Sequence, residues 1–481
     1  MNILLTNIPQ EFETKEYTTP DYIKSFERYP PLGLMAIAAD VDSMHTIKIL
    51  DVSVPALSVE ETIEYIREYH PDVLGISVTS RLLYAMNVIT HRVKDVLPDT
   101  KIVVGGAHVT YFPRETMELG AIDYALPGFG EKTFPLLIEA IAAGEKPEAL
   151  AIIPNLYYRA AGKQIKSNPY DEPPIVLDPI PFPNRRLINL DDYYSVISKG
   201  RMTTLYTSRG CPFHCIFCDI QDKKFRYRTA KCVVDEFEEI ANLGIKELLI
   251  LDDTFNANRK RVIDICNEII RRGLKISWGA RARLYPFDEE IISLLKKAGC
   301  NRLHVGVESL DRDILRYMRK GITPEHISQF FRLCKEYDME TLAYFILGFP
   351  NETREYRAGL MKELDKLNIN FLFFNVLYPL AKTQYYQELL DGGIYKRDYW
   401  ADFNRNPTKY FELPLPRSPE LQQELLETAD RLTSGFYLRP KFIWQEFKRS
   451  FRSPRALWEA AKVAVSLFRL RWLRRSTVRE Q

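Results

Sequence analysis

The sequence lacks the long hydrophobic runs of a membrane-spanning protein and the signals of a secreted one. No stretch of its 481 residues reaches the about 18 apolar residues that a helix needs to cross a bilayer. The apolar start, Asn2 to Ile8, has no basic segment before it and no small-residue cleavage site after it, so it predicts a first strand. Seven cysteines, an odd number, argue against a disulfide framework. We therefore expect a cytoplasmic protein with reduced thiols.

Two common phosphate-binding motifs are also missing. No G-x-G-x-x-G follows the first predicted strand, and no G-x-x-x-x-G-K followed by Ser or Thr occurs. Their absence counts against a dinucleotide or a nucleoside triphosphate as ligand. The composition is ordinary for a globular protein, with 46% hydrophobic and 27% charged residues, and the length favours two or three domains.

Residues 1–145 alternate short apolar runs with segments of helical periodicity, which predicts an α/β fold with a doubly wound (Rossmann-like) sheet. The five expected parallel strands begin at Asn2, Thr46, Val73, Lys101 and Asp123. A ligand should bind beyond their carboxyl ends. Residues 146–195 lose this periodicity and accumulate prolines, so we expect a linker.

A second series of six strand–helix units spans residues 196–400. Its expected strands begin at Thr203, Glu247, Lys275, Arg302, Thr341 and Phe371. Six units are too few for a closed eight-fold barrel, so they predict a partial TIM-type (βα)6 barrel with its chemistry at the strand carboxyl ends. Residues 401–481 are expected to form a C-terminal helical region.

Three cysteines, Cys211, Cys215 and Cys218, form a C-x3-C-x2-C pattern on a glycine- and proline-broken loop after the first of these strands. Such a loop suits an iron–sulfur cluster or zinc, because thiolates are soft ligands. A four-iron cluster held by three cysteines leaves one iron able to bind a substrate. A zinc site with His214 as fourth ligand and a chance group of core cysteines are the alternatives. The other four cysteines are expected to be packing residues.

The cysteine pattern, with Phe217 just before the last cysteine, resembles the radical S-adenosylmethionine (radical SAM) superfamily. The resemblance implies a 4Fe-4S cluster whose open iron chelates SAM. One electron, from a flavodoxin- or ferredoxin-type donor, then cleaves SAM to a 5′-deoxyadenosyl radical that abstracts hydrogen from unactivated carbon.

Later strand ends resemble the same superfamily and imply contacts with SAM. Arg281 or Arg283 would pair with its carboxylate, Glu308 and Ser309 would meet its ribose and amino group, and the backbone at Gly348 would approach the adenine. Each polar residue also has a plain interpretation as a helix cap or an ion pair. The implied SAM-binding residues are Phe217, Asp252, Arg281, Arg283, Glu308, Ser309, Gly348 and Pro350, with Asp253 facing the same side.

Small-residue loops in the N-terminal region resemble the cobalamin-binding domain fused to one radical SAM subgroup. That subgroup includes the class B methyltransferases and the anaerobic Mg-protoporphyrin monomethyl ester cyclase. The implied cobalamin-binding residues are Ser77, Thr79, Gly105, Gly106, His108, Gly128, Gly130 and Glu131. The sequence departs from the pattern twice: it has no D-x-H-x-x-G motif, so no histidine from it would ligate cobalt, and Phe129 stands where relatives often carry Glu.

The resemblance implies methyl transfer from methylcobalamin to an unactivated carbon. Three alternatives are oxidative cyclisation or carbon–carbon coupling, a radical SAM enzyme whose N-terminal domain does not bind cobalamin, and a zinc-stabilised binding protein.

The C-terminal tail is strongly basic, with eleven Lys and Arg against two Glu between Phe436 and Arg475. Its interleaved tryptophans and arginines predict an amphipathic helix that could lie on the inner membrane face. A helix packed on the barrel is the alternative. Membrane contact would favour a hydrophobic small-molecule substrate that is lipid-, isoprenoid- or tetrapyrrole-like. No nucleic acid is expected, because the rest of the chain is acidic.

Overall fold

The structure is a computed structural model that describes residues 1–12, 27–41, 43–160, 164–195, 201–440 and 442–444. The chain forms two compact units. The first contains the described residues of Met1–Lys15, Pro31–Asp192 and Gln387–Pro414, and the second those of Glu16–Pro30, Tyr193–Tyr386 and Leu415–Gln481.

The first unit is built on a parallel sheet of five strands. These are β1 (Asn2–Thr6), β3 (Thr46–Leu50), β4 (Val73–Ser77), β5 (Lys101–Gly105) and β6 (Tyr124–Leu126), in the order β3-β1-β4-β5-β6. The central strands β1 and β4 are short apolar runs whose side chains are buried on both sides of the sheet, as Ile3, Leu4 and Leu5 of β1 are. The predicted doubly wound sheet is confirmed.

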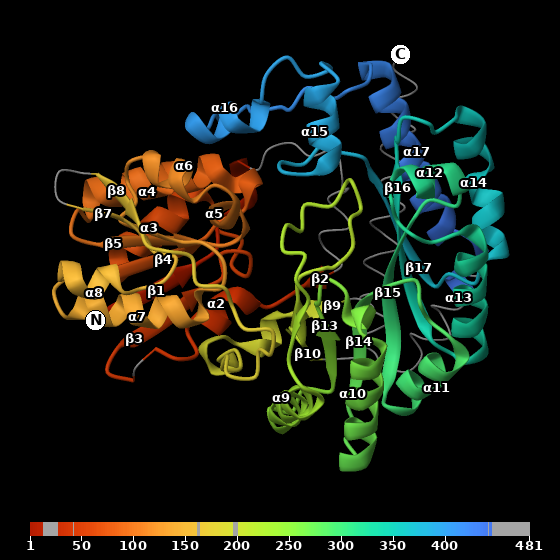
Figure 1. Ribbon diagram of the computed structural model, residues 1–481, viewed down its shortest axis with the longest axis horizontal. Coiled ribbons are helices and arrows are strands. Elements are labelled where there is room, and N and C mark those ends of the chain that lie inside the picture. The colour runs from red at the N-terminus through yellow and green to blue at the C-terminus, as the bar shows by residue number, and fades with distance from the viewer. Residues whose placement is uncertain (13–26, 42, 161–163, 196–200, 441, 445–481) are drawn as a thin grey trace. The chain divides into compact units, whose positions relative to one another are not determined.

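Helices cover both faces of this sheet (Figure 1). On one face lie α3 (Val59–Tyr69), α4 (Leu83–Val96) and α6 (Pro113–Glu118), and on the other α2 (Leu32–Ile37) and α7 (Gly130–Ala142). The start of α3 shows how local sequence sets a boundary. Ser58 accepts from the backbone of Glu61, and the Glu61 carboxylate accepts from the backbone of Ser58, so this capping box satisfies two otherwise unpaired donors.

Part of the segment that we expected to be a linker belongs to the first unit. Strands β7 (Tyr157–Arg159) and β8 (Ile165–Ser167) extend the sheet antiparallel from β6. The strand signal is weak because β7 and β8 have three residues each, but Leu156 and Tyr158 are buried. Helix α16 (Tyr399–Arg405), from far along the chain, packs against α6 in the same unit.

The second unit is built on six parallel strands in chain order. They are β10 (Met202–Leu205), β13 (Glu247–Ile250), β14 (Ser277–Arg283), β15 (Cys300–Glu308), β16 (Glu340–Leu347) and β17 (Phe371–Val376). Their order is that of an opened barrel, so the predicted partial barrel is confirmed. The helices that follow the strands are α9 (Ala230–Asn242), α10 (Arg259–Arg272), α11 (Glu289–Lys297), α12 (Arg312–Tyr317), α13 (Pro324–Glu336) and α14 (Arg354–Lys366).

The exposed edge of this sheet is covered by a C-terminal helix. Helix α17 (Pro419–Tyr437) packs on β17, and the Tyr437 hydroxyl donates to the carbonyl of Leu372 at 2.8 Å and accepts from its N–H at 3.1 Å. One side chain thereby satisfies both polar groups of an edge-strand residue.

The remaining elements are short. They are α5 (Ala107–Tyr111), α8 (Pro147–Ala151), α15 (Gln384–Asp391), the pair β2 (Glu27–Arg28) and β9 (Tyr194–Ser195), the pair β11 (Ser208–Arg209) and β12 (Arg226–Tyr227), and 3-10 turns at Gln10–Phe12, Ser80–Leu82, Arg185–Leu187, Leu190–Asp192 and Phe255–Ala257.

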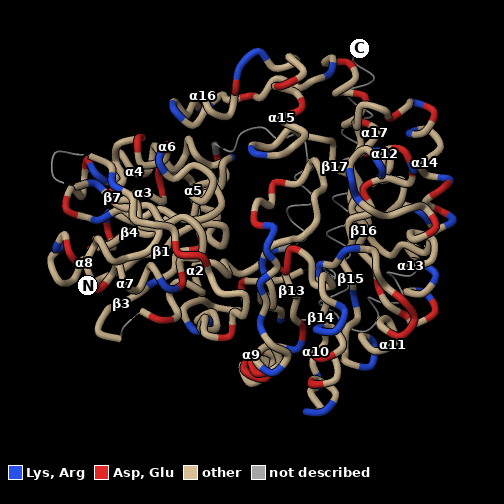
Figure 2. The backbone as a smooth tube through the Cα atoms, in the orientation of Figure 1, with Lys and Arg blue, Asp and Glu red and all other residues tan. Residues whose placement is uncertain are grey.

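Charged residues gather mainly on the helices and loops of both units, while the first unit's strands carry few (Figure 2). In the part of the chain that the structure describes, no helix combines the length and apolar character needed to traverse a bilayer. The predicted membrane-contact segment, 436–475, lies outside the described residues except for 436–440 and 442–444.

Candidate functional site

The three-cysteine loop lies between β11 and β12, directly after the first barrel strand. All three thiols are free and half-buried. Burial, with smaller contributions from the neighbouring Cys215 and Cys211, raises the pKa of Cys218 to about 12. The loop begins at Gly210 with φ +79°, where a Cβ would lie 2.2 Å from the carbonyl oxygen of Lys224. Only glycine fits this turn.

Two aspartates at the end of β13 hold the start of this loop. Asp252 is fully buried, and its two oxygens accept four hydrogen bonds, from the backbone N–H groups and hydroxyls of Thr207 and Ser208. Through these bonds Asp252 anchors the start of the loop, and its expected contact with SAM stays a prediction. Asp253 accepts from the N–H of Gly210 at 2.8 Å.

The other side of the loop is held by segments far along the chain. The backbone N–H of Ile216 donates to the carbonyl of Met318 at 3.2 Å, and the carbonyl of Ile216 accepts from the backbone N–H of Tyr385 at 2.8 Å. The Cys215 thiol points to the carbonyl of Arg319 at 3.8 Å. The loop is therefore clamped between the end of α12 and the start of α15, which no local pattern in the sequence indicates.

Phe217 and the end of β15 form one cluster. The Phe217 ring meets Phe349 edge-on at 6.1 Å, and the Lys320 ammonium lies 5.8 Å from the Phe217 ring. Lys320 also donates to Glu308 at 2.7 Å in a buried ion pair. Glu308 sits at a β-bulge with φ +66°, a backbone strain of the kind found near ligand sites.

Ser309 has a partner that the sequence did not suggest. Its hydroxyl lies 2.9 Å from that of Tyr356, which also accepts from the N–H of Leu310, and Ser309 accepts from the N–H of Asp311. These contacts order the turn after β15. Lys320 and Tyr356 are therefore two further residues of this region that the sequence analysis missed.

The two arginines of β14 differ in their surroundings. Arg283 is 9% exposed, lies 4.0 Å above the Phe213 ring, and directs one N–H to the Cys215 sulfur at 3.7 Å. Arg281, two residues earlier on the same strand, is exposed. The structure thus brings Arg283, and not Arg281, into contact with the cysteine loop.

The turn after β16 is fixed by residues from two directions. Gly348 has φ +92°, its N–H donates to Glu352 at 3.0 Å, and its carbonyl accepts from Arg417 at 3.2 Å. Arg417 also donates to the carbonyl of Leu377. Arg417 holds this turn from beyond the barrel, and nothing in its local sequence indicates that role. Pro350 is exposed at the tip.

In the first unit, the implied cobalamin-binding residues gather where three strands end. The strand order of the parallel sheet places its topological switch point between β1 and β4, where doubly wound folds bind ligands. Ser77 ends β4 and the exposed Thr79 follows it, Gly105 ends β5 and Gly106 follows it, and Gly128, Gly130 and Glu131 come after β6. A Cβ at Gly106 would lie 2.8 Å from the carbonyl oxygen of Val78, so two of these loops approach as closely as glycine allows.

His108 joins the loops after β4 and β5. The side chain is fully buried, and its Nδ1 lies 3.0 Å from the Ser80 hydroxyl. The backbone N–H of His108 donates to the carbonyl of Val78 at 3.1 Å. Burial lowers the pKa of His108 to about 4, so the imidazole is neutral at pH 7. Its Nε2 is buried without a hydrogen-bond partner.

Both sets of residues fit the cofactors that the motifs imply. Three free thiols on one loop suit a cluster with one free iron. The glycines at these strand ends leave backbone surface for a large flat ligand. Among the described residues, no three His, Cys, Asp or Glu side chains converge on a single metal ion. A cluster does not require such convergence, since each of its thiolates binds a different iron.

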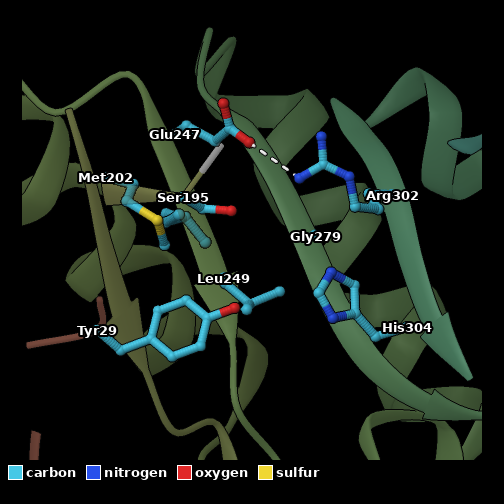
Figure 3. Close-up of a pocket in the computed structure, with 9 residues that line it drawn as sticks. Tyr29, Ser195, Met202, Glu247, Leu249, Gly279, Arg302 and His304 are labelled. Atoms are coloured by element: carbon cyan, nitrogen blue, oxygen red, sulfur yellow. Dashed lines mark hydrogen bonds and ion pairs between the residues drawn. The ribbon is translucent and has the colours of Figure 1, made fainter. Parts of the chain in front are cut away.

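A separate small pocket lies near the amino ends of the barrel strands (Figure 3). His304 and the Glu247–Arg302 ion pair line it together with Tyr29 and Met202. Burial lowers the pKa of His304 well below its usual value. Because barrel enzymes carry their chemistry at the strand carboxyl ends, we do not assign the reaction to this pocket.

The fold and the thiol loop define the protein's class as a radical SAM enzyme preceded by a doubly wound ligand-binding domain. Family models agree: the Radical SAM superfamily matches residues 205–364, and the B12 binding domain matches residues 22–138. An uncharacterized methyltransferase of Pyrococcus horikoshii is 32% identical over 86% of this chain and 89% of its own length. The chain belongs to the B12-binding radical SAM family, and its cofactors are a 4Fe-4S cluster, SAM and cobalamin.

Other relatives differ in what they do. The anaerobic magnesium-protoporphyrin IX monomethyl ester cyclase of Cereibacter sphaeroides is 29% identical over 71% of this chain and 57% of its own length. The cytidylyl-2-hydroxyethylphosphonate methyltransferase of Streptomyces wedmorensis is 27% identical over 76% of this chain and 78% of its own. The solved structure of the methyltransferase TsrM from Kitasatospora setae shares the fold, with a TM-score of 0.62 and 21% identity over 81% of this chain and 75% of its own.

Proposed function

We propose that this cobalamin-dependent radical SAM enzyme transfers a methyl group to an unactivated carbon of a hydrophobic substrate. The observation that carries the proposal is the extent of the match to the Pyrococcus horikoshii methyltransferase, which spans both units. The hopanoid C-2 methylase of Rhodopseudomonas palustris is also similar, with 25% identity over 84% of this chain and 72% of its own length.

When bound, the cluster and SAM supply the 5′-deoxyadenosyl radical and cobalamin supplies the methyl group. The chain's own residues would bind and orient these groups. We propose Cys211, Cys215 and Cys218 as the cluster ligands. The proposed SAM-binding residues are Phe217, Asp252, Arg281, Glu308, Ser309, Gly348 and Pro350. For cobalamin we propose Ser77, Thr79, Gly105, Gly106, His108, Gly128, Gly130 and Glu131.

Aromatic side chains on the inner wall of the barrel are the support for a hydrophobic substrate. Tyr344 and Phe373 stack at 6.2 Å with an interplanar angle of 27°, and both are half-buried. Ile346 and Asn375, next along the same strands, are also half-buried. Half-exposed aromatic rings inside a barrel offer apolar area to a ligand, whereas fully packed rings would not. A lipid-, isoprenoid- or tetrapyrrole-like molecule fits this wall.

Oxidative cyclisation is the second candidate, because the Cereibacter sphaeroides cyclase is nearly as similar in the matched region. The two reactions consume SAM differently. Methyl transfer converts one SAM to S-adenosylhomocysteine and a second to 5′-deoxyadenosine, whereas cyclisation needs only the second conversion.

The test is anaerobic reconstitution with iron, sulfide and hydroxocobalamin, followed by incubation with deuteromethyl SAM, dithionite and a hydrophobic extract. We expect S-adenosylhomocysteine, 5′-deoxyadenosine and an extractable product carrying the label. Formation of 5′-deoxyadenosine with neither of the others would contradict methyl transfer. Cys215→Ala should abolish 5′-deoxyadenosine formation, whereas Cys232→Ala, a half-buried cysteine on α9, serves as the matched control.

A further inference from the structure

Arg283 lies against a cysteine of the three-thiol loop in a geometry that its neighbours dictate. Its N–H and carbonyl exchange hydrogen bonds with the buried Asn256 side chain, both at 2.8 Å. Its guanidinium lies 4.0 Å above the Phe213 ring. Gly321, with φ +67°, makes room for it, because a Cβ there would come within 3.0 Å of the Arg283 Nη2.

This packing directs one guanidinium N–H group of Arg283 at the sulfur of Cys215. One guanidinium nitrogen donates to the Cys215 sulfur at 3.7 Å, and the side chain is 9% exposed. A positive charge held in such a place is only weakly screened by solvent. Hydrogen bonds and charges at cluster sulfurs are among the main determinants of the reduction potential of an iron–sulfur cluster.

We propose that Arg283 tunes the cluster, as a positioning residue that raises the reduction potential by donating to the Cys215 thiolate. Reduction adds one electron to a cluster that is already anionic, so a fixed cation beside a ligand sulfur stabilises the reduced state more than the oxidised one. The electron comes from the external donor and passes to SAM. Arg283 forms and breaks no bond in this step. The inference rests on cluster binding and is independent of whether the reaction is methylation or cyclisation.

This assignment changes the role that the sequence suggested for Arg283. The Arg283 guanidinium already contacts Phe213 and Cys215 in the absence of SAM. The exposed Arg281 is then the β14 arginine that remains for the SAM carboxylate.

The experiment is a redox titration of the reconstituted full-length protein without SAM, followed by electron paramagnetic resonance. In Arg283→Gln we expect the ratio of reduced to oxidised cluster at a fixed potential to fall about tenfold, equal to about 59 mV for a one-electron couple. Arg316→Gln removes a charge from an α12 side chain that is 74% exposed, and should leave the potential unchanged.

Two further variants test the same role of Arg283 if the Arg283→Gln protein does not bind a cluster. Arg283→Lys keeps the charge and should shift the potential less than Phe213→Leu, which removes the ring that holds the guanidinium in place. If both variants bind a full cluster at the wild-type potential, the proposal is wrong. An Arg283→Gln protein with an unchanged potential and weakened SAM binding would also overturn it, and would assign Arg283 to SAM.

Discussion

At the scale of single residues, Asp252 shows how one buried carboxylate can organise a cofactor loop. Its oxygens accept from Thr207 and Ser208, immediately before the cysteines. We predict that Asp252→Asn lowers the free energy of unfolding by about 2 kcal/mol, because an amide has one acceptor oxygen where the four buried donors now share two. Urea unfolding and iron content per chain measure the effect. Asp264→Asn, in a surface ion pair on α10, should change the free energy by less than about 0.5 kcal/mol.

His108 leads to a prediction about pH. In the folded protein burial lowers its pKa to about 4, while an unfolded histidine titrates near 6.5. Between these values the unfolded chain binds the extra proton, so this contribution to stability is complete above about pH 6.5 and is lost as pH falls toward about 4, with a slope of at most about 1.4 kcal/mol per pH unit.

The measurement is the pH dependence of hydrogen exchange in β4 and β5. His108→Gln should flatten it, and His91→Gln, an exposed histidine on α4, should not. An unchanged pH dependence in His108→Gln would contradict the neutral, buried imidazole.

At the scale of elements, the barrel edge depends on a helix that follows it in the chain. Tyr437 of α17 satisfies both backbone groups of Leu372. We predict that Tyr437→Phe, which keeps the ring, costs about 1–3 kcal/mol because two buried polar groups lose their partner. Amide exchange at Leu372 should accelerate. The matched control is Tyr410→Phe, because Tyr410 is 83% exposed. Equal amide exchange at Leu372 in the two variants would refute the capping role of Tyr437.

The strand and helix pattern was largely predictable, and the exceptions share a cause. Except for β6, the parallel strands of both sheets have four or more residues, and each alternates with a segment of helical periodicity, so the local sequence pattern finds them. Strands β7 and β8 have three residues each and are stabilised by pairing with β6 and with each other. Their strand conformation is set by neighbours in the sheet, so local sequence predicts them poorly.

At the scale of the whole molecule, cofactor binding should stabilise each unit separately. Hydroxocobalamin at a hundred times its dissociation constant should stabilise the unit that binds it by about 2.7 kcal/mol. We expect slower hydrogen exchange in β4, β5 and β6 of the first unit with hydroxocobalamin. SAM, added in its place to the reconstituted protein, should protect the turns after β15 and β16. Protection by cobalamin confined to the second unit would contradict the assignment of the strand-end loops.

The sequence by itself determined the two sheets, the six-strand count of the barrel and the identity of the thiol loop, because periodicity and ligand spacing are local properties of the chain. Only the tertiary structure decided which side chains hold that loop. Asp252 anchors it from β13, Met318 and Tyr385 clamp its other side, and Arg417 fixes the Gly348 turn from 69 residues away. Each of these contacts joins residues that lie far apart in the chain, and a hydrogen bond between such residues exists only once the fold has brought its donor and acceptor together.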